Sequence, residues 1–235
     1  MSTRIWDSHA VSAKQLDKQM LAWEFACRQR QAAPASQRPT VEDFICISRQ
    51  VGAGGRAIAT LLGERLGWAV FDQQLLHLMA GDDAVRERIY TSMDERDVGW
   101  FEQAARSLMD PKFARNDYFH RLTETVLTLA RQGHAVFLGR GAAFMLPSDA
   151  GFRVRIVAPL DKRLAEFARK SGLSSSAAGE EVTRLERERN EFVWTHFHKR
   201  VDDPLLHDLT LNVARLTPAR AVEVILSART AASRP

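Results

Sequence analysis

Residues 44–71 have the sequence FICISRQVGAGGRAIATLLGERLGWAVF, and the pattern changes three times along this segment. Residues 44–48 form an apolar run without polar alternation, which is typical of a parallel strand buried on both faces. A glycine cluster follows at residues 52–55, and residues 56–66 then place apolar side chains on one helical face. Residues 69–71 are again apolar. This order predicts a strand, a glycine-rich loop, a helix and a second strand.

The remainder of the chain continues the alternation of apolar runs and amphipathic segments. The apolar runs predict strands at residues 135–138, 152–158 and 209–213. The amphipathic segments predict helices at residues 117–132, 160–170, 177–198 (one long helix or a helix pair) and 218–229. Such alternation is typical of an α/β fold with a central parallel sheet. Because these sheets bind ligands at the carboxyl ends of their strands, we expect the loops after Ser48, Phe71 and Leu138 to meet at one site.

The beginning and the end of the chain are expected to lie outside this sheet. Residues 9–31 carry a helical stripe, and residues 32–39 contain two prolines and no stripe. The stripe consists of Leu16, Met20, Trp23 and Cys27. We therefore expect residues 1–40 to form a helical extension with a linker, docked on the body or on a partner. Residues 41–228 are expected to form the main domain, and residues 229–235 a flexible tail.

Composition restricts the class of protein. The chain has 235 residues, and its 33 Lys and Arg against 29 Asp and Glu give a formal net charge of +4. This excess suits an anionic small ligand, but basic and acidic residues are interleaved, unlike in a nucleic-acid binder. No apolar run is long enough to span a bilayer, so we expect neither nucleic acid nor a membrane as a partner. With only two cysteines, Cys27 and Cys46, a disulfide framework is excluded and a cytoplasmic location is expected.

The glycine cluster lies where a parallel sheet would bind a phosphate group. A glycine-rich loop between a strand and a helix exposes backbone N–H groups, and the helix N-terminus adds the positive end of its dipole. A Walker A loop has the pattern Gly, four residues, Gly-Lys-Ser/Thr. Here the lysine position holds Gly55, or Arg56 if the loop is shifted by one residue, and the hydroxyl position holds Arg56 or Ala57. The pattern alone fits a phosphate site and a tightly packed strand–helix turn equally well.

Polar residues near the other strand ends are further candidates. Arg140 lies on a glycine-flanked turn after residues 135–138, where a guanidinium can hold a phosphate with two hydrogen bonds. Its alternative is an ordinary surface arginine. Asp72 ends the second strand, and it either orients a substrate hydroxyl or a metal-bound water, or caps the helix that follows.

The charged segment at residues 177–198 contains Arg184, Arg187 and Arg189 interleaved with glutamates. These residues form either a solvated helix face or a lid whose arginines stabilise charge on a transferring phosphoryl group. The charge pattern by itself favours the solvated face. No histidines and cysteines have the spacing of a zinc site, and we predict no metal ligands in the chain.

Taken in order, these segments resemble the cytidylate kinase-like family of P-loop nucleoside monophosphate kinases. The resemblance covers roughly residues 41–228, and the order of the motifs carries it. The motifs are ICISRQVGAGGRAIA (45–59), FDQQLL (71–76), VFLGRGA (136–142), RVRIVAP (153–159) followed by Arg163, ERER (186–189) and DLTLN (208–212).

The resemblance implies a three-layer P-loop kinase fold with a central parallel sheet, a helical acceptor-binding insertion at residues 72 to about 115, and a lid. It implies transfer of a phosphoryl group from ATP, with Mg²⁺, to a nucleoside monophosphate such as CMP or dCMP, or to a related small acceptor. The implied residues for the donor phosphates are Ser48, Gly52, Ala53, Gly54, Gly55, Arg56 and Ala57. The acceptor would be bound by Asp72 and Arg140. Arg187 and Arg189 would close over the transferring group, and Arg56 would partly replace the lysine.

The altered loop leaves a second interpretation open. Without the lysine and the hydroxyl residue, donor activation and Mg²⁺ ligation lack their usual side chains. The alternative is a catalytically weak or inactive nucleotide-binding regulatory protein. The motifs do not fix the acceptor base, and they leave a homodimer open.

Overall fold

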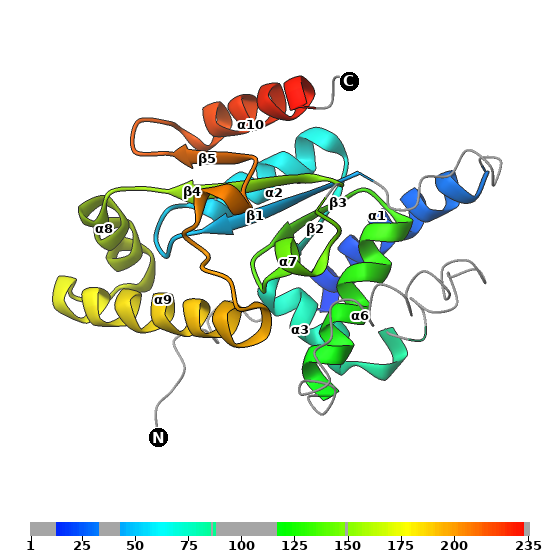
Figure 1. Cartoon of the computed structure of the whole chain (residues 1–235), viewed down its shortest axis with the longest axis horizontal. Coiled ribbons are helices and arrows are strands. Elements are labelled where there is room, and N and C mark those ends of the chain that lie inside the picture. Colours follow the sequence, from blue (N-terminus) through cyan, green and yellow to red (C-terminus); the bar gives the residue numbers. More distant parts are fainter. Residues whose placement is uncertain (1–12, 33–42, 86, 88–116, 149, 233–235) are drawn as a thin grey trace.

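The computed structural model describes residues 13–32, 43–85, 87, 117–148 and 150–232. A five-stranded, all-parallel sheet forms its centre, with the order β2-β3-β1-β4-β5 (Figure 1). The strands are β1 (Phe44–Arg49), β2 (Ala69–Asp72), β3 (Ala135–Leu138), β4 (Phe152–Val157) and β5 (Leu209–Asn212). Each strand lies where an apolar run predicted it, so the α/β class is confirmed.

The register brings the carboxyl ends of three strands to one edge of the sheet. Strand β1 lies between β3 and β4, with Ile47 opposite Leu138 and Ser48 opposite Arg155. On the other side of β3, Asp72 at the end of β2 also lies opposite Leu138. The loops after β1, β2 and β3 therefore begin at the same level, at the edge where such sheets bind ligands.

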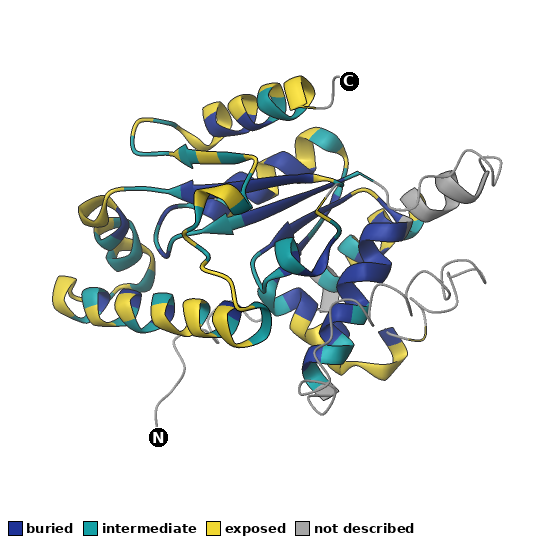
Figure 2. Cartoon of the chain, viewed as in Figure 1, coloured by how far each residue is buried: buried dark blue, intermediate teal, exposed yellow. Residues whose placement is uncertain are grey.

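Helices cover both faces of the sheet and complete three layers. Because neighbouring side chains of a strand point to opposite faces, Ile45 and Val136 pack in the same core as α2 (Gly55–Leu66) and α10 (Pro218–Ala232). Phe44 and Phe137 point the other way, into the core formed with α3 (Gln73–Gly81) and α6 (Asp117–Gln132). The central strands are accordingly buried on both sides (Figure 2).

Two helices lie beyond the carboxyl edge of β4. They are α8 (Leu160–Ser171) and α9 (Ser175–Phe197), which pack against each other (Figure 1). Helix α9 is a single helix with an exposed outer face (Figure 2). Its buried Val182 and Leu185 pack against Val51, which follows β1. Helix α9 is therefore docked on the glycine-rich loop.

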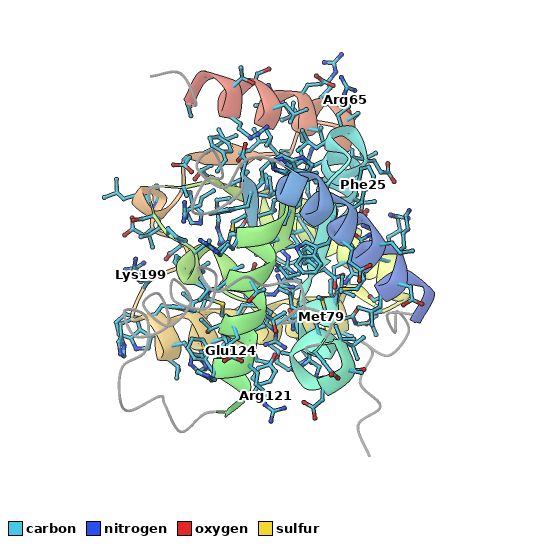
Figure 3. The ribbon with its side chains drawn as sticks, turned by 90° about the vertical axis from the view of Figure 1, so that its right-hand side faces the viewer. Phe25, Arg65, Met79, Arg121, Glu124 and Lys199 are labelled. Carbon is cyan, nitrogen blue, oxygen red and sulfur yellow. The ribbon has the colours of Figure 1, made fainter. Side chains whose placement is uncertain are left out.

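The N-terminal helix docks on the body of the protein. Helix α1 (Ala13–Ala32) lies beside α6 (Figure 3), where Met20 and Trp23 are fully buried. The indole Nε1 of Trp23 donates a hydrogen bond to the carbonyl oxygen of Leu129, at 3.1 Å. The side-chain oxygen of Gln19 accepts from the N–H of Val70 on the edge strand β2, at 2.6 Å. Of the two docking modes expected from sequence, the structure shows docking on the body.

Several boundaries differ from the sequence predictions. Helix α10 ends at Ala232, so residues 229–232 continue the helix and are not part of a tail. The short helix α7 (Ala142–Met145) and the 3-10 helix η3 (Pro204–Leu206) were not predicted. Most of the expected acceptor-binding insertion, residues 88–115, lies outside the described residues. No helix in the described ranges is long and apolar enough to cross a membrane.

Candidate active site

A cavity of about 1050 Å³ opens at the carboxyl edge of the sheet. Its walls come from the ends of β1 and β3, from α7, and from the inner face of α9. Of the residues that sequence analysis selected, it is lined by Ser48, Arg56, Arg140, Arg184 and Arg189. The lining does not include the loop residues 52–55, nor Ala57, Asp72 or Arg187. The predicted site residues are thus only partly brought together around one cavity.

The glycine-rich loop connects β1 to α2 beside this cavity. Gly52 and Gly54 have positive φ angles of 80° and 75°, which allow the chain to turn sharply before α2 begins at Gly55. A Cβ atom on Gly52 would overlap the backbone carbonyl of Arg163, so the loop approaches α8 closely at this point. The first turn of α2 has no acidic residue and no side-chain cap. Its N-terminus therefore offers backbone N–H groups and a positive dipole end to an anion.

The inner wall of the cavity is rich in arginine. Besides the predicted Arg140 and Arg189, the lining includes Arg49 at the end of β1 and Arg155 on β4. Arg155 donates a hydrogen bond from Nη1 to the Ser48 hydroxyl oxygen, at 2.7 Å. Arg49 and Arg155 were not selected from the sequence. Arg49 could have been selected because it directly follows the apolar run of β1, at the strand end where ligands are expected.

Burial and mutual repulsion place these cations under electrostatic stress. Burial, and then the neighbouring Arg189, Arg56 and Arg140, hold the pKa of Arg49 well below its usual value, although Asp72 opposes this shift. Burial lowers the pKa of Arg189 to about 10, although Glu186 opposes this shift. Burial also lowers the pKa of Arg155. A bound anion would relieve this stress, because it would supply the opposite charge that the guanidiniums lack.

The carboxylates that line the cavity do not neutralise these arginines. Glu181 and Glu188 pair with Arg184, along the same helix. Asp202 pairs with Arg200 at 3.1 Å. Among the described residues, no carboxylate lies within ion-pair distance of Arg49, Arg140, Arg155 or Arg189. The cavity is therefore a positively charged recess.

Glu186 connects the lid helix to the loop. Its Oε1 lies 2.7 Å from Nη1 of Arg163 and accepts a hydrogen bond from the N–H of Val51, at 3.2 Å. Arg163 also donates to the carbonyl oxygen of Val51, at 3.2 Å. These contacts hold the middle of α9 against the start of the glycine-rich loop. They explain why α9 lies over the cavity, although most of its charged residues face solvent.

Arg140 and Arg189 reach the cavity from opposite sides. Arg140 has a φ of 55°, a left-handed conformation that is uncommon for a residue with a side chain. Its guanidinium lies over the ring of Phe192 at 5.5 Å, and its buried Nε has no hydrogen-bond partner among the described residues. Arg189 donates from Nη1 to the carbonyl oxygen of Arg49, at 3.4 Å. Both side chains keep donors available to a ligand.

Asp72 and Arg187 have different surroundings from those expected. One carboxylate oxygen of Asp72 accepts from the N–H groups of Gln74 and Leu75, both at 3.0 Å, and so caps α3. The other oxygen lies 3.0 Å from Nη2 of Arg56. Arg187 is 70% exposed and lies 3.8 Å from Glu191 along α9. For these two residues the structure agrees with the alternatives, a helix cap and a solvated helix face.

Nucleophilic and metal chemistry find little support in the cavity. Burial raises the pKa of the Cys46 thiol to about 12, so this thiol stays protonated at neutral pH. Among the described residues, no group of three or more His, Cys, Asp or Glu side chains is placed to hold a metal ion. The guanidinium groups that line the cavity are suited to binding an anionic group such as a phosphate.

The strand order, the glycine-rich loop between β1 and α2, and the cavity at the carboxyl edge together define a P-loop kinase fold. Comparison with known proteins narrows this class. The model of the cytidylate kinase-like family matches residues 44–215, and the chain belongs to that family. The match confirms the resemblance drawn from the motifs.

Individual relatives agree with the family match. The cytidylate kinase of Ignicoccus hospitalis is 27% identical over 185 residues, which are 77% of this chain and 95% of that protein. The cytidylate kinase of Halobacterium salinarum is 24% identical over 186 residues, covering 79% and 88% of the two chains. A crystal structure of an uncharacterized protein from Eubacterium ventriosum superposes with a TM-score of 0.65 at 17% identity. That superposition covers 82% of this chain and 99% of the other, and it supports the fold.

Proposed function

We propose that the protein is an ATP-dependent phosphotransferase of the nucleoside monophosphate kinase type, with CMP or dCMP as the first acceptors to test. The observation that carries the proposal is the group of cavity arginines that no described carboxylate neutralises. A donor triphosphate and an acceptor phosphate would supply the missing negative charge. The names of the cytidylate kinase relatives support the choice of acceptors.

In the proposed reaction, an oxygen of the acceptor phosphate attacks the terminal phosphorus of ATP. The bond from that phosphorus to the bridging oxygen breaks, and ADP leaves. Catalysis of such a transfer depends mainly on positioning and on stabilising charge. The loop from Gly52 to Ala57 and the N-terminus of α2 would hold the donor phosphates. Arg140 would hold the acceptor phosphate, and Arg189 would stabilise the transferring group.

Ser48, Arg56 and Asp72 have supporting places in this proposal. The hydroxyl of Ser48 is engaged by Arg155, so Ser48 positions that guanidinium at the cavity wall. Asp72 holds Arg56 through their ion pair. Arg56 lies at the first turn of α2, next to the loop. It would add positive charge at the mouth of the donor site.

The described residues do not fit a magnesium ion held by the protein. The carboxylates of the cavity are paired with arginines, and the usual hydroxyl position of the loop is occupied by Arg56 or Ala57. Magnesium keeps several waters and is commonly bound through substrate phosphates. When bound with ATP, it would supply additional positive charge. No protein ligand for it is proposed.

A second candidate function is nucleotide binding without turnover. The loop has glycine or arginine where lysine is expected, and this substitution favours a sensor or regulator. Such a protein would be stabilised by ATP but would form no ADP. In such a protein, helix α1 would be the element through which a partner is bound.

The deciding experiment is ADP formation from ATP and Mg²⁺ with CMP, dCMP, UMP, AMP, GMP and no acceptor. Turnover with one acceptor, with a higher acceptor KM in Arg140→Ala, would support the kinase. Arg169→Ala is the matched control, because this exposed arginine pairs with Glu166 on α8. A thermal shift with ATP but no turnover would favour the binding protein. Absence of both would contradict both candidates.

A further inference from the structure

The glycine-rich loop contains an exchange of residue types that goes beyond a missing lysine. When Gly54 is matched to the second glycine of the Walker pattern, Gly55 occupies the lysine position. The first glycine of that pattern then corresponds to Arg49. The chain thus has a cation where the pattern has glycine, and glycine where the pattern has a cation. The structure shows that these two changes are physically linked.

The side chain of Arg49 occupies the space that a side chain at position 55 would need. A Cβ atom built on Gly55 would lie 2.9 Å from both Cβ and Cγ of Arg49. Real Cβ atoms do not approach neighbours this closely, so one of the two positions must be glycine. The stem of Arg49 therefore crosses the start of α2 from the β1 side. It enters the same region that a lysine would enter from position 55.

A second glycine accommodates the guanidinium group of Arg49. A Cβ atom on Gly139, which follows β3, would overlap Nη1 of Arg49. Gly139 also has a positive φ of 81° and lines the cavity. The arginine thus passes between Gly55 at the start of α2 and Gly139 after the end of β3. This arrangement places its charged end beside Gly139 at the wall of the cavity.

The guanidinium of Arg49 has no ion pair or hydrogen bond with any described residue. Burial and the charges of Arg189, Arg56 and Arg140 disfavour its protonated form, and the attraction of Asp72 offsets this only in part. A partly buried cation that faces like charges and has no ion-pair partner is unfavourable for a folded protein. The arrangement is reasonable only if a ligand supplies negative charge when the protein works. The triphosphate of a donor nucleotide carries enough negative charge to do so.

We propose that Arg49 is the principal donor-phosphate cation of this protein and replaces the loop lysine from the opposite end of the loop. Gly55 and Gly139 make room for it. Arg56 is less suited to this task, because its side chain is 50% exposed and is paired with Asp72. The proposal rests on the proposed function for its donor nucleotide. It also makes the altered loop compatible with catalysis.

The proposal is tested with four variants: Arg49→Met, Arg49→Lys, Gly55→Lys and the double variant Arg49→Gly/Gly55→Lys. Binding of inorganic tripolyphosphate and of CMP is measured by calorimetry, and ADP formation gives kcat and the KM for ATP. Arg49→Met keeps an unbranched apolar stem over Gly55, so a loss of binding cannot be assigned to a cavity. Arg169→Ala is the control variant. Melting temperatures without ligand report on folding.

We expect Arg49→Met to weaken tripolyphosphate binding by at least tenfold and to lower kcat by at least a hundredfold, with CMP binding changed by less than threefold. Arg49→Lys should recover part of the binding. Gly55→Lys alone should lower the melting temperature, because its side chain overlaps Arg49. The double variant should melt at a higher temperature than Gly55→Lys and bind tripolyphosphate more tightly than Arg49→Met. Such a non-additive recovery would show that a cation at position 49 and a cation at position 55 can replace each other.

Two results would overturn the proposal. One is unchanged tripolyphosphate binding in Arg49→Met. The other is a double variant that is no better than the sum of its single changes. Failure of the proposed function has a different outcome, in which the wild type binds tripolyphosphate through Arg49 but turns over no acceptor. A wild type that binds no tripolyphosphate would contradict both.

Discussion

Two sets of arginines in this protein are bonded very differently: Arg153 and Arg163 are buried, whereas Arg49, Arg140 and Arg189 are partly buried and line the cavity. Arg153 on β4 points to the α7 side of the sheet and donates from Nε, Nη1 and Nη2 to the backbone carbonyls of Ala143, Ala150 and Leu146, at 3.1, 2.8 and 3.1 Å. Arg163 donates to the carbonyls of Ala158 and Val51 and pairs with Glu186.

The arginines of the cavity have almost none of these contacts. Arg49 has no hydrogen bond or ion pair with a described residue, and Arg140 has a buried Nε without a partner there. Arg189 makes one long hydrogen bond, to the carbonyl of Arg49. An arginine whose donors are satisfied by the protein stabilises the fold. One whose donors remain available costs stability and is suited to bind an anion.

The difference between the two sets of arginines predicts that the largest effect of a substitution is on turnover, at Arg189. Arg189→Ala should lower kcat about a thousandfold, because a cation that acts on the transferring phosphoryl group stabilises the transition state. The KM for ATP should change much less. Arg187→Ala, two residues earlier on the exposed face, should change kcat by less than about threefold. Equal losses in the two variants, measured by steady-state kinetics, would contradict the separation of the two faces.

The next effect is on folding. Arg153→Ala removes the donors of several buried carbonyls and should lower the free energy of unfolding by about 3 kcal/mol or more, measured by urea denaturation. Arg169→Ala, at an exposed pair on α8, should leave the unfolding midpoint nearly unchanged. A loss of stability no greater for Arg153→Ala than for the control would remove the distinction between the two sets.

A smaller effect is expected on acceptor affinity. Arg140→Ala should raise the acceptor KM about tenfold to thirtyfold, which corresponds to about 1.4 to 2 kcal/mol for the loss of a charge-assisted phosphate contact. The affinity for ATP should be nearly retained, and calorimetry with each ligand separates the two. An equal loss of ATP binding would place Arg140 in the donor site instead.

The smallest expected effect is on the stability of the ligand-free protein when a cavity arginine is removed. Arg140→Met removes a guanidinium whose Nε has no hydrogen-bond partner among the described residues, and it keeps an apolar stem beside Phe192. The free energy of unfolding of the ligand-free protein should therefore stay constant or rise by about 1 kcal/mol. Thermal melting of the ligand-free protein tests this expectation. A marked destabilisation, comparable to that of Arg153→Ala, would mean that Arg140 serves the fold.

Much of the fold could be predicted from local patterns. The apolar runs at β1 and β3 predicted strands because buried parallel strands need apolar side chains on both faces. The loop at residues 52–55 was recognised because only glycine readily adopts its positive φ angles. Helix α7 was missed because four residues carry too little periodicity to detect. The helical pattern of α1 was visible, but its docking on α6 and β2 depends on contacts distant in sequence.

The site shows the same division between local pattern and distant contact. The sequence by itself determined the parallel α/β sheet, the position of the glycine-rich loop and the family. It did not separate Arg187 from Arg189, both of which the family resemblance placed over the transferring group. Only the tertiary structure decided that Arg189 faces the cavity, that Asp72 caps α3, and that Arg49 fills the space beside Gly55. The reason is physical: periodicity acts between neighbours in the chain, whereas burial, charge compensation and close approach depend on which strand ends meet in space.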